Sequence, residues 1–496
     1  MTTKLLSPTD AAAWLQERVS GGLTTDSRQV RPGDGFIAWP GAAADGRRFV
    51  ADALTAGALA CLVEAQDSSP FEFTDPRLAF YSGLKTAAAP IAAAYYEQPS
   101  RQLQTVAITG TNGKTSTAWW LAHAFERLGR KCGVIGTLGI GVPSAMVFNG
   151  LTTPDPVLLQ RELRRFVDEG FSACAIEASS IGIAEYRLDA VNIQVAVFTN
   201  FSQDHLDYHP SMAHYWAAKE SLFSWPGLAS AVINIDDGKG AELVARLEKA
   251  GLPVWSVSCA QPARIQVCSV DQSADVMTVE FVEGQERHRV ELATIGLFNV
   301  SNILCVVGSL RALGVPLQDA VNACVGLPPV PGRLNTLALD GGPLVVIDYA
   351  HTPDALEKVL TALKPVAAKR AGQLWCVFGC GGDRDSAKRP LMGSAAQKHA
   401  DQVVVTSDNP RSENPDAIIE QISAGLTGAK SFHAQPDRAK AIAEAVRQAG
   451  AKDVILIAGK GHEDYQEFDG VKVPFSDQSH AQAALKLRAT QTAALC

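Results

Sequence analysis

The chain of 496 residues is too long for one hydrophobic core and indicates about three domains. Hydrophobic residues make up 47% and charged residues 19%, and no apolar run approaches the roughly 18 residues of a membrane helix, so the composition is that of a globular chain. The net charge of -8 argues against general nucleic-acid binding, although local arginines and lysines can still hold an anionic small molecule.

The N-terminus and the cysteines favour a cytoplasmic location. Residues 1–8 show neither the apolar stretch nor the cleavage site of a signal peptide. The ten cysteines are scattered and form no C-x-x-C pair, which favours reduced, buried thiols over disulfides or a zinc site. Those in apolar runs are Cys132, Cys174, Cys305 and Cys324.

The first predicted unit, residues 1–100, contains short strands and turn signals. One strand is expected over 33–38, and one helical stretch over about 49–57. An alanine-rich helix, 84–96, leads out of this unit.

The second unit, residues 101–332, begins with a buried strand at Val106 and a glycine-rich turn, GTNGKT (110–115), before a helix. Backbone N–H groups in such a turn surround phosphate oxygens, Lys114 can reach the β- and γ-phosphates, and the Thr115 hydroxyl can bind Mg²⁺. The turn is a shortened P-loop, since Ile108 stands where the general pattern has its first glycine. Strand-like runs at 173–175, 193–198 and 230–235 alternate with helical patterns and predict an α/β parallel sheet.

Two strand ends of this unit carry polar side chains. Glu177 is a candidate for completing Mg²⁺ coordination beside Thr115, with a helix-initiating glutamate as the alternative. The next strand ends in TNFSQDHLDYH (199–209), which brings two carboxylates and two imidazoles close together. Lys219 follows in a predicted helix over 211–223, and its spacing alone predicts a surface lysine.

The third unit, residues 333–496, repeats the pattern of strand, loop and helix and predicts a Rossmann-like α/β domain. Strands are expected over 344–347, 374–378, 402–406 and 454–457. The polar clusters DYAH (348–351), GCGGDRD (379–385), SDNPR (407–411) and GKGHE (459–463) follow these strands, where ligands bind in such sheets. The proline pair 328–329 marks an expected hinge between the second and third units.

These motifs together resemble the Mur ligases over essentially the whole chain. The residues that carry the resemblance are GTNGKT (110–115), Glu177 with Ser179 and Ser180, TNFSQDHLDYH (199–209), AAK (217–219), NIDD (234–237), GLFNVSN (296–302), PGR (331–333) and DYAHTPD (348–354). The segments TDSR (25–28), PGD (32–34) and DG (45–46) look like the uridine-nucleotide-binding domain of the member that adds the third residue of the peptidoglycan stem peptide. The resemblance implies three domains, which bind a UDP-sugar, ATP and an amino acid in that order.

In that family, the resemblance implies, ATP phosphorylates a carboxylate and an amine then attacks the acyl phosphate to give an amide, ADP and phosphate. The implied catalytic residues are Lys114, Lys219, His205 and His351, and either His351 or Asp348 can assist deprotonation of the amine. The implied Mg²⁺ ligands are Thr115, Glu177, His205 and Lys219, the last in carbamylated form. The implied ATP contacts are Gly110, Thr111, Asn112, Gly113, Lys114, Thr115, Ser116, Asn299, Asn302, Arg333 and Asp348. The implied UDP-sugar contacts are Thr25, Ser27, Thr152, Thr153, Ser179 and Arg187.

The amine is indicated by the third unit, whose DNPR loop resembles that of the members that add meso-2,6-diaminopimelate. The implied contacts are Arg384, Asp408, Asn409, Pro410, Arg411, Gly459 and Glu463. Diaminopimelate differs from lysine by a distal carboxylate, for which the Arg411 guanidinium is a natural partner, while Glu463 can pair with the distal ammonium. Lysine would leave Arg411 unpaired, so the motif also disfavours that competitor.

The expected partners are therefore small molecules, with no nucleic acid or membrane partner, and a monomer is expected. The alternatives are a lysine-adding relative, a folylpolyglutamate synthase, which lacks the first domain and DNPR, and a non-catalytic ATP-binding scaffold. A scaffold would be expected to have lost Lys114, Glu177, His205 or Lys219, and none is lost. Two departures from the family pattern, Ile181 and Glu185, put local packing and one substrate contact in doubt, not the reaction class. GKGHE could also be a second phosphate loop, but it has no serine or threonine after its lysine.

Overall fold

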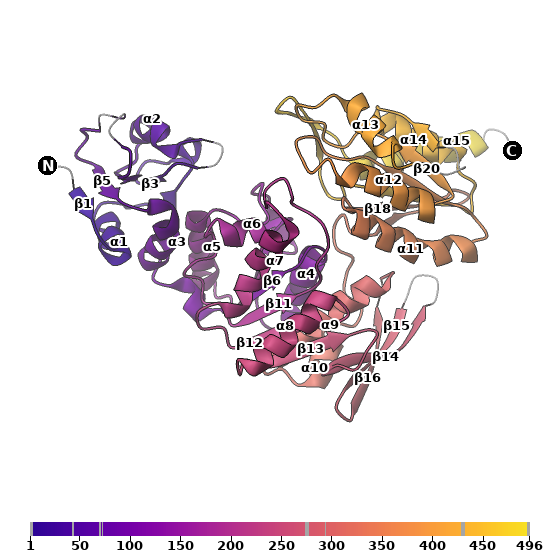
Figure 1. The fold of residues 1–496 in the computed structure, drawn as a ribbon, viewed down its shortest axis with the longest axis horizontal. Helices are drawn as coiled ribbons and strands as arrows, with labels where there is room; N and C mark the ends of the chain where they lie inside the picture. Colours follow the sequence, from indigo (N-terminus) through magenta and orange to yellow (C-terminus); the bar gives the residue numbers. More distant parts are fainter. Residues whose placement is uncertain are drawn as a thin grey trace.

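The computed structural model describes residues 3–41, 44–68, 71, 73–272, 277–292, 294–427 and 432–493. Of the four sheets among the described residues, the three larger ones follow one another along the chain, and each forms the centre of an α/β domain (Figure 1). The N-terminal and C-terminal domains flank the central one. Within the described ranges, no helix combines the length and apolar character needed to cross a membrane.

The N-terminal sheet is parallel throughout, with strand order β1-β5-β4-β3-β2. Its strands are β1 (Thr3–Leu5), β2 (Leu23–Thr24), β3 (Gly35–Ala38), β4 (Ala60–Glu64) and β5 (Leu78–Tyr81). Its helices are α1 (Pro8–Gln16), η1 (Ser27–Gln29), η2 (Gly46–Phe49), α2 (Val50–Thr55), α3 (Leu84–Tyr95) and η4 (Pro99–Gln102). The predicted strand and helices fall on β3, α2 and α3. The sequence analysis missed α1, which Ser7 caps by accepting the N–H of Asp10.

The central sheet has the order β16-β15-β14-β13-β12-β11-β6-β10-β7-β8-β9, parallel from β14 to β7 and antiparallel at both edges. Its strands are β6 (Gln104–Thr109), β7 (Cys132–Gly136), β8 (Gly139–Val142), β9 (Ala145–Val147), β10 (Ala173–Glu177), β11 (Val195–Phe198), β12 (Ser230–Asn234), β13 (Val254–Ser258), β14 (Ile265–Gln272), β15 (Met277–Glu283) and β16 (Glu286–Leu292). Its helices are α4 (Lys114–Arg127), α5 (Pro156–Asp168), α6 (Ser180–Ala184), α7 (Met212–Glu220), η5 (Ser221–Ser224), α8 (Gly238–Lys249), α9 (Leu297–Ala312) and α10 (Leu317–Asn322). The predicted helix over 211–223 is thus divided between α7 and η5.

The C-terminal sheet has the order β17-β18-β22-β19-β20-β21, parallel except for the β17–β18 pair. Its strands are β17 (Asn335–Leu337), β18 (Leu344–Asp348), β19 (Leu374–Phe378), β20 (Gln402–Val405), β21 (Phe432–Ala434) and β22 (Val454–Ala458), with a separate hairpin of β23 (Tyr465–Phe468) and β24 (Val471–Pro474). Its helices are α11 (Pro353–Lys369), α12 (Lys388–His399), α13 (Pro415–Ser423), α14 (Arg438–Gln448) and α15 (Asp477–Ala493). The four strands predicted from the sequence match β18, β19, β20 and β22 to within a residue at either end.

Helices cover both faces of the central sheet, and the alternation of side chains along β6 shows why. Val106 and Ile108 belong to the hydrophobic cluster formed with α4, α9 and α10, whereas Ala107 belongs to the cluster formed with α5 and α8. Because both faces are buried, the strand is apolar throughout and its polar groups are confined to its ends. The glycine-rich turn therefore emerges at the carboxyl edge of a rigid sheet.

Cysteines behave as the sequence predicts. Nine lie in the described part of the chain, all as free thiols, and Cys132, Cys174, Cys305 and Cys324 are buried. Burial raises the pKa of the Cys132 thiol to about 12. These thiols are parts of the core.

Candidate active site

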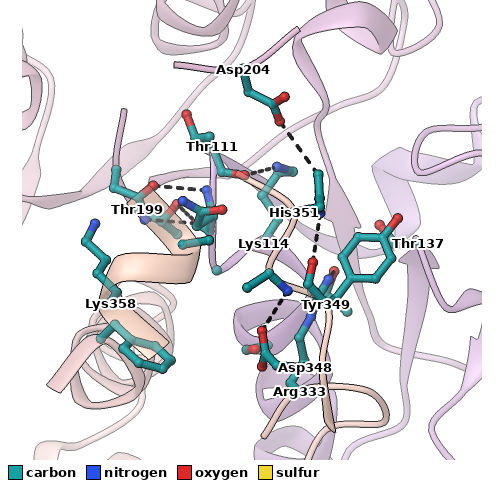
Figure 2. Close-up of a pocket in the computed structure, with 18 of the residues that line it drawn as sticks. Thr111, Lys114, Thr137, Thr199, Asp204, Arg333, Asp348, Tyr349, His351 and Lys358 are labelled. Carbon is teal, nitrogen blue, oxygen red and sulfur yellow. Dashed lines mark hydrogen bonds and ion pairs between the residues drawn. The ribbon is translucent and has the colours of Figure 1, made fainter. Parts of the chain in front are cut away.

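A cavity of about 1020 Å³ lies where the carboxyl ends of the central strands face those of the C-terminal sheet. The residues that line it come from the loops after β6, β10 and β11 on one side and from those after β18, β19, β20 and β22 on the other. Figure 2 shows part of it, with Thr111 and Lys114 of the central domain near His351 and Tyr349 of the C-terminal domain.

The turn 110–115 adopts a conformation that requires glycine. Gly113 has a φ of 88°, and a Cβ at this position would lie 2.3 Å from Oδ1 of Asn302. The Lys114 ammonium donates hydrogen bonds to the carbonyls of Gly110 (2.8 Å) and Thr111 (2.7 Å). Burial lowers the pKa of Lys114, although Glu177 and Asp204 act in the opposite direction.

Thr115 and Glu177 form a pair of oxygen ligands suited to Mg²⁺. The Thr115 hydroxyl donates to Oε2 of Glu177 at 2.9 Å, and Glu177 is only 1% exposed. The N–H of Thr137 donates to Oε1 of the same carboxylate (2.9 Å) and fixes its orientation. Neighbouring oxygens of an octahedral Mg²⁺ site lie about 3 Å apart, since each Mg–O bond is about 2.1 Å. The donor chemistry and spacing therefore fit this ion.

The predicted metal ligands do not form a cluster of ionisable side chains. In the described ranges, no group of three or more His, Cys, Asp and Glu side chains is arranged to hold a metal. The predicted set instead combines a threonine hydroxyl, a single carboxylate, an imidazole and a modified lysine.

Lys219 is buried, contrary to what its spacing in the sequence predicts. It is 1% exposed, because α7 turns it inward under the glycine-rich turn. Its amine donates to the carbonyl of Gly110 at 2.8 Å and lies 4.4 Å from the ring centre of Tyr215. Burial holds the pKa of Lys219 well below its ordinary value, and the nearby Lys114 lowers it further. A neutral amine is the form that reacts with carbon dioxide to give a carbamate.

His205 lies beside these lysines in a strained backbone conformation, with a φ of 53°. Burial lowers its pKa to about 4, with Lys114 and Lys219 acting in the same direction and Asp204 opposing them. The imidazole is therefore neutral at physiological pH, which is the form that binds metals.

Asp204 connects the two domains around this centre. Its carboxylate lies 3.4 Å from Nε2 of His205, 3.8 Å from Nε2 of His351 and 3.8 Å from Nζ of Lys388. Burial alone would raise the pKa of Asp204, but interactions with His205, His351 and Lys388 together lower it. The sequence analysis missed Lys388, because only the tertiary structure brings the first turn of α12 to this loop.

Further contacts hold the domains against each other. The Asn112 amide donates to Oδ2 of Asp354 at 3.0 Å, and the Arg333 guanidinium donates to the Thr115 hydroxyl at 3.3 Å. Arg333 also lies 4.3 Å from the ring centre of Tyr349. Two residues of the glycine-rich turn, Asn112 and Thr115, are thus hydrogen-bonded to the C-terminal domain.

The remaining predicted nucleotide contacts surround the same cavity. Ser116, Asn299, Asn302 and Asp348 line it together with the turn, whereas Gly110 contributes its carbonyl but does not line it. Both carboxylate oxygens of Asp348 accept backbone N–H groups, from Leu334 (2.9 Å) and Ala350 (2.8 Å). His351 instead presents Nε2 toward Asp204, while its Nδ1 lies 2.8 Å from the carbonyl of Tyr349 (Figure 2).

The predicted UDP-sugar residues divide between two cavities. Thr152, Thr153, Ser179 and Arg187 line the main one, and Thr25 lines a smaller cavity of about 240 Å³ between the N-terminal domain and α5. Leu151 lines both, so the two cavities adjoin. Ser27, the remaining predicted residue, lies in η1 and lines neither cavity.

Glu185, one of the two departures, is engaged by neighbouring side chains. Its carboxylate pairs with Lys85 of α3 at 2.7 Å and accepts a hydrogen bond from the Tyr208 hydroxyl at 2.5 Å. Neither Glu185 nor these two partners lines the main cavity, whereas Ile181 does.

The predicted amine-binding residues converge at the C-terminal side of the main cavity. Arg384, Asp408, Asn409, Arg411, Gly459 and Glu463 line it, and Pro410 is the one predicted member that does not. The Arg411 guanidinium donates to the carbonyl of Gly382 at 2.7 Å and lies 3.4 Å from the Glu467 carboxylate. Its backbone has a φ of 53°, and its N–H donates to the carbonyl of Glu467, so the hairpin β23–β24 fixes where this cation lies.

A P-loop on a parallel sheet, a threonine–glutamate oxygen pair that suits Mg²⁺ and a second α/β domain across the cavity are typical of a nucleotide-dependent enzyme. Three family models match the chain: the Mur ligase family catalytic domain over residues 20–92, the Mur ligase middle domain over 108–310, and the Mur ligase glutamate ligase domain over 332–461. The chain belongs to the Mur ligase family, whose members use ATP.

Close relatives share its full length. A UDP-N-acetylmuramoyl-L-alanyl-D-glutamate--2,6-diaminopimelate ligase from Acidovorax sp. (strain JS42) is 56% identical, with 97% of each chain covered. The ligase of the same name from Pseudomonas aeruginosa is 45% identical, with 93% of this chain and 94% of the relative covered. A solved structure of a ligase with this name is 34% identical, has a TM-score of 0.64, and covers 94% of this chain and 95% of its own. The MurF ligase of Thermotoga maritima in complex with ADP shares the fold, with a TM-score of 0.69 at 18% identity over 96% of this chain and 99% of its own.

Proposed function

We propose that this Mur ligase joins meso-2,6-diaminopimelate to UDP-N-acetylmuramoyl-L-alanyl-D-glutamate, with conversion of ATP to ADP and phosphate. The observation that carries the proposal is a single cavity that is lined both by the P-loop and by Arg411 and Glu463. A guanidinium and a carboxylate at the far end of the cavity match the distal carboxylate and ammonium of diaminopimelate. Full-length relatives at up to 56% identity bear the name of this activity.

The first chemical step is transfer of the γ-phosphoryl group to the glutamate side-chain carboxylate of the UDP-linked substrate. A carboxylate oxygen forms a bond to the γ-phosphorus as the bond to the β-phosphate oxygen breaks, which gives an acyl phosphate and ADP. Lys114 neutralises charge on the β- and γ-phosphates, and the backbone N–H groups of 110–115 orient them. Mg²⁺, held by Thr115 and Glu177, supplies further positive charge to the phosphates when bound.

The second step is attack of the diaminopimelate amine on the acyl carbon, with release of phosphate and loss of one proton from the nitrogen. His351 is better placed than Asp348 to accept that proton, because both oxygens of Asp348 are occupied by backbone N–H groups. The Nε2 of His351 lies in the cavity near Asp204. Contacts such as Asn112 to Asp354 keep the domains closed and exclude water from the acyl phosphate.

We further propose that Lys219 is carbamylated and that the enzyme is cytoplasmic. A carbamate on Lys219, together with His205, would hold a second Mg²⁺ against the substrate carboxylate, and the buried neutral amine supports this assignment. The need for ATP and the free thiols among the described residues support a cytoplasmic enzyme.

The direct test is phosphate release from ATP, Mg²⁺ and the UDP-linked dipeptide with different amines. We expect release with meso-diaminopimelate, little with L-lysine, and none with either amine after the metal is removed by a chelator. Equal efficiency with lysine would refute the specificity, and no release with any amine would favour a non-catalytic ATP-binding protein.

A second test changes the residue assigned to the distal carboxylate. Arg411→Met is expected to lower kcat/KM for diaminopimelate about 10²-fold, since loss of one partner of a buried charge pair costs at least about 2 kcal/mol. Lysine has no distal carboxylate, so its efficiency should change little and the preference for diaminopimelate should fall by the same factor. Methionine suits the test because glycine would also relax the left-handed backbone.

The matched control is Arg447→Met, which replaces an exposed arginine on α14. It should leave both efficiencies unchanged. An equal loss for both amines in Arg411→Met would show that Arg411 supports the fold of the loop and does not discriminate between the amines.

A further inference from the structure

Lys460 is a fully buried cation beneath the amine-binding residues. It is 0% exposed, and it lies in the loop 459–463 that follows β22. Its Nζ donates to Oδ1 of Asn409 at 2.9 Å and to Oε2 of Glu463 at 3.1 Å, and it lies 3.9 Å from Oδ1 of Asp408. The ammonium is therefore surrounded by three oxygens, all from residues assigned to the amine.

The backbone of the loop fixes the direction of this side chain. Gly459 has a φ of 117°, and a Cβ there would lie 2.4 Å from Oδ2 of Asp408. The N–H of Glu463 donates to the carbonyl of Lys460 at 2.9 Å and closes a tight turn. Among the described residues that line the main cavity, Gly459 and Glu463 are present and Lys460 is not. Lys460 thus points beneath the cavity, so the GKGHE segment is not a second phosphate loop.

Among the described residues, Lys460 is the one cation that forms an ion pair with the Glu463 carboxylate. The Asn409 amide donates to its Oε2 at 3.0 Å, and the Tyr349 hydroxyl lies 3.4 Å from its Oε1. Asn409 is itself held, because its Oδ1 also accepts the N–H of Glu467 at 3.1 Å. Lys460 bridges Asn409 and Glu463, and its charge offsets that of two buried or half-buried carboxylates, Asp408 and Glu463.

We propose that Lys460 is a positioning residue for the amine substrate, which holds the Glu463 carboxylate in place without contacting the substrate. Removal of one member of a buried charge network leaves its partner unpaired, and the partner then moves. The distal ammonium of diaminopimelate would then lose its acceptor. This inference rests on the proposed function, because it needs an ammonium that binds Glu463.

The test is a double-mutant cycle with Lys460→Met, Glu463→Gln and the double variant. Each single change is expected to raise KM for diaminopimelate about 10- to 100-fold, as supporting residues of a site commonly do, while KM for ATP stays unchanged. The double variant should be no worse than Glu463→Gln alone, because Lys460 acts through Glu463. The control Lys472→Met removes the exposed lysine over the same Tyr465 ring and should leave every KM unchanged.

If the two single changes raise KM for diaminopimelate additively in the double variant, or if KM for ATP rises as much as KM for diaminopimelate, the proposal is overturned. Lys460 would then have only a structural role. An unchanged KM for diaminopimelate in Lys460→Met would likewise overturn the proposal. If Lys460→Met alone does not fold, the double variant still decides the matter, since it leaves no unpaired charge at this pair of residues. A wild-type enzyme that fails to use diaminopimelate would instead refute the proposed function, so the two failures are distinguishable.

Discussion

Lys219→Ala is expected to lower turnover about 10³-fold while the protein remains folded, because alanine removes a group that stabilises charge in the first chemical step. The amine is 1% exposed and donates only to the carbonyl of Gly110 among the hydrogen bonds of the described residues. Its depressed pKa makes it a neutral nucleophile toward carbon dioxide, and the carbamate would then face His205 across the cavity. Small carboxylates such as formate or acetate should restore part of the activity, since they can occupy the space of the carbamate.

The measurements are initial rates of phosphate release and the mass of the intact protein, which reports the added carbon dioxide. Lys249→Ala, a change at the exposed end of α8, is the matched control and should turn over at the normal rate. A normal rate in Lys219→Ala would rule out the assigned role. Loss of activity without any rescue by carboxylates would argue for the amine itself and against the carbamate.

Arg438→Met is expected to destabilise the C-terminal domain by about 3–5 kcal/mol, the cost of breaking a buried ion pair at one end. The Arg438 guanidinium donates twice to the Asp477 carboxylate, at 2.7 Å each, and both side chains are 0% exposed. It also donates to the carbonyls of Ser407 (3.2 Å), just after β20, and of Ala458 (3.0 Å), the last residue of β22. Both strands are followed by loops that line the proposed amine site. Loss of the cation therefore removes four hydrogen bonds and leaves the buried Asp477 carboxylate without its ion-pair partner.

Hydrogen exchange of the β20 and β22 amides in increasing urea measures the local free energy of opening. Lys440→Met, on the exposed side of the same helix, should change it by no more than about 0.5 kcal/mol. The double variant Arg438→Met with Asp477→Leu should recover part of the loss, because it leaves no unpaired buried charge. A loss below about 1 kcal/mol for Arg438→Met alone would contradict this account.

The sequence predicts the strands that carry the site, because these strands are buried on both faces and bounded by polar turns. The helix predicted after the glycine-rich turn is present as α4. The meander β14–β16 was not anticipated. Only two residues of β16 are buried, so its hydrophobic signal is weak.

The contacts between domains could not be predicted in the same way. Asn112 and Asp354 are separated by 242 residues, and nothing local in either segment indicates the other. Lys388 is similar, since its approach to Asp204 depends on how two domains pack. Lys219 shows the limit most clearly. Its spacing suggested a surface position, and only the resemblance to the Mur ligases indicated a role for it.

The adjoining cavities at Leu151 have a consequence for the length of substrate that the enzyme accepts. The small cavity lies against the N-terminal domain and the P-loop lies in the central one, so the separation between them is set by the packing of α3 on α5 and by the Lys85–Glu185 ion pair. If the substrate of the proposed function is anchored by its nucleotide in the small cavity, its peptide end would lie at a fixed distance. A peptide one residue shorter would stop before the phosphate, and one residue longer would occupy the place of the incoming amine. The relative placement of two rigid domains would thus select the stage of peptide assembly at which this enzyme acts.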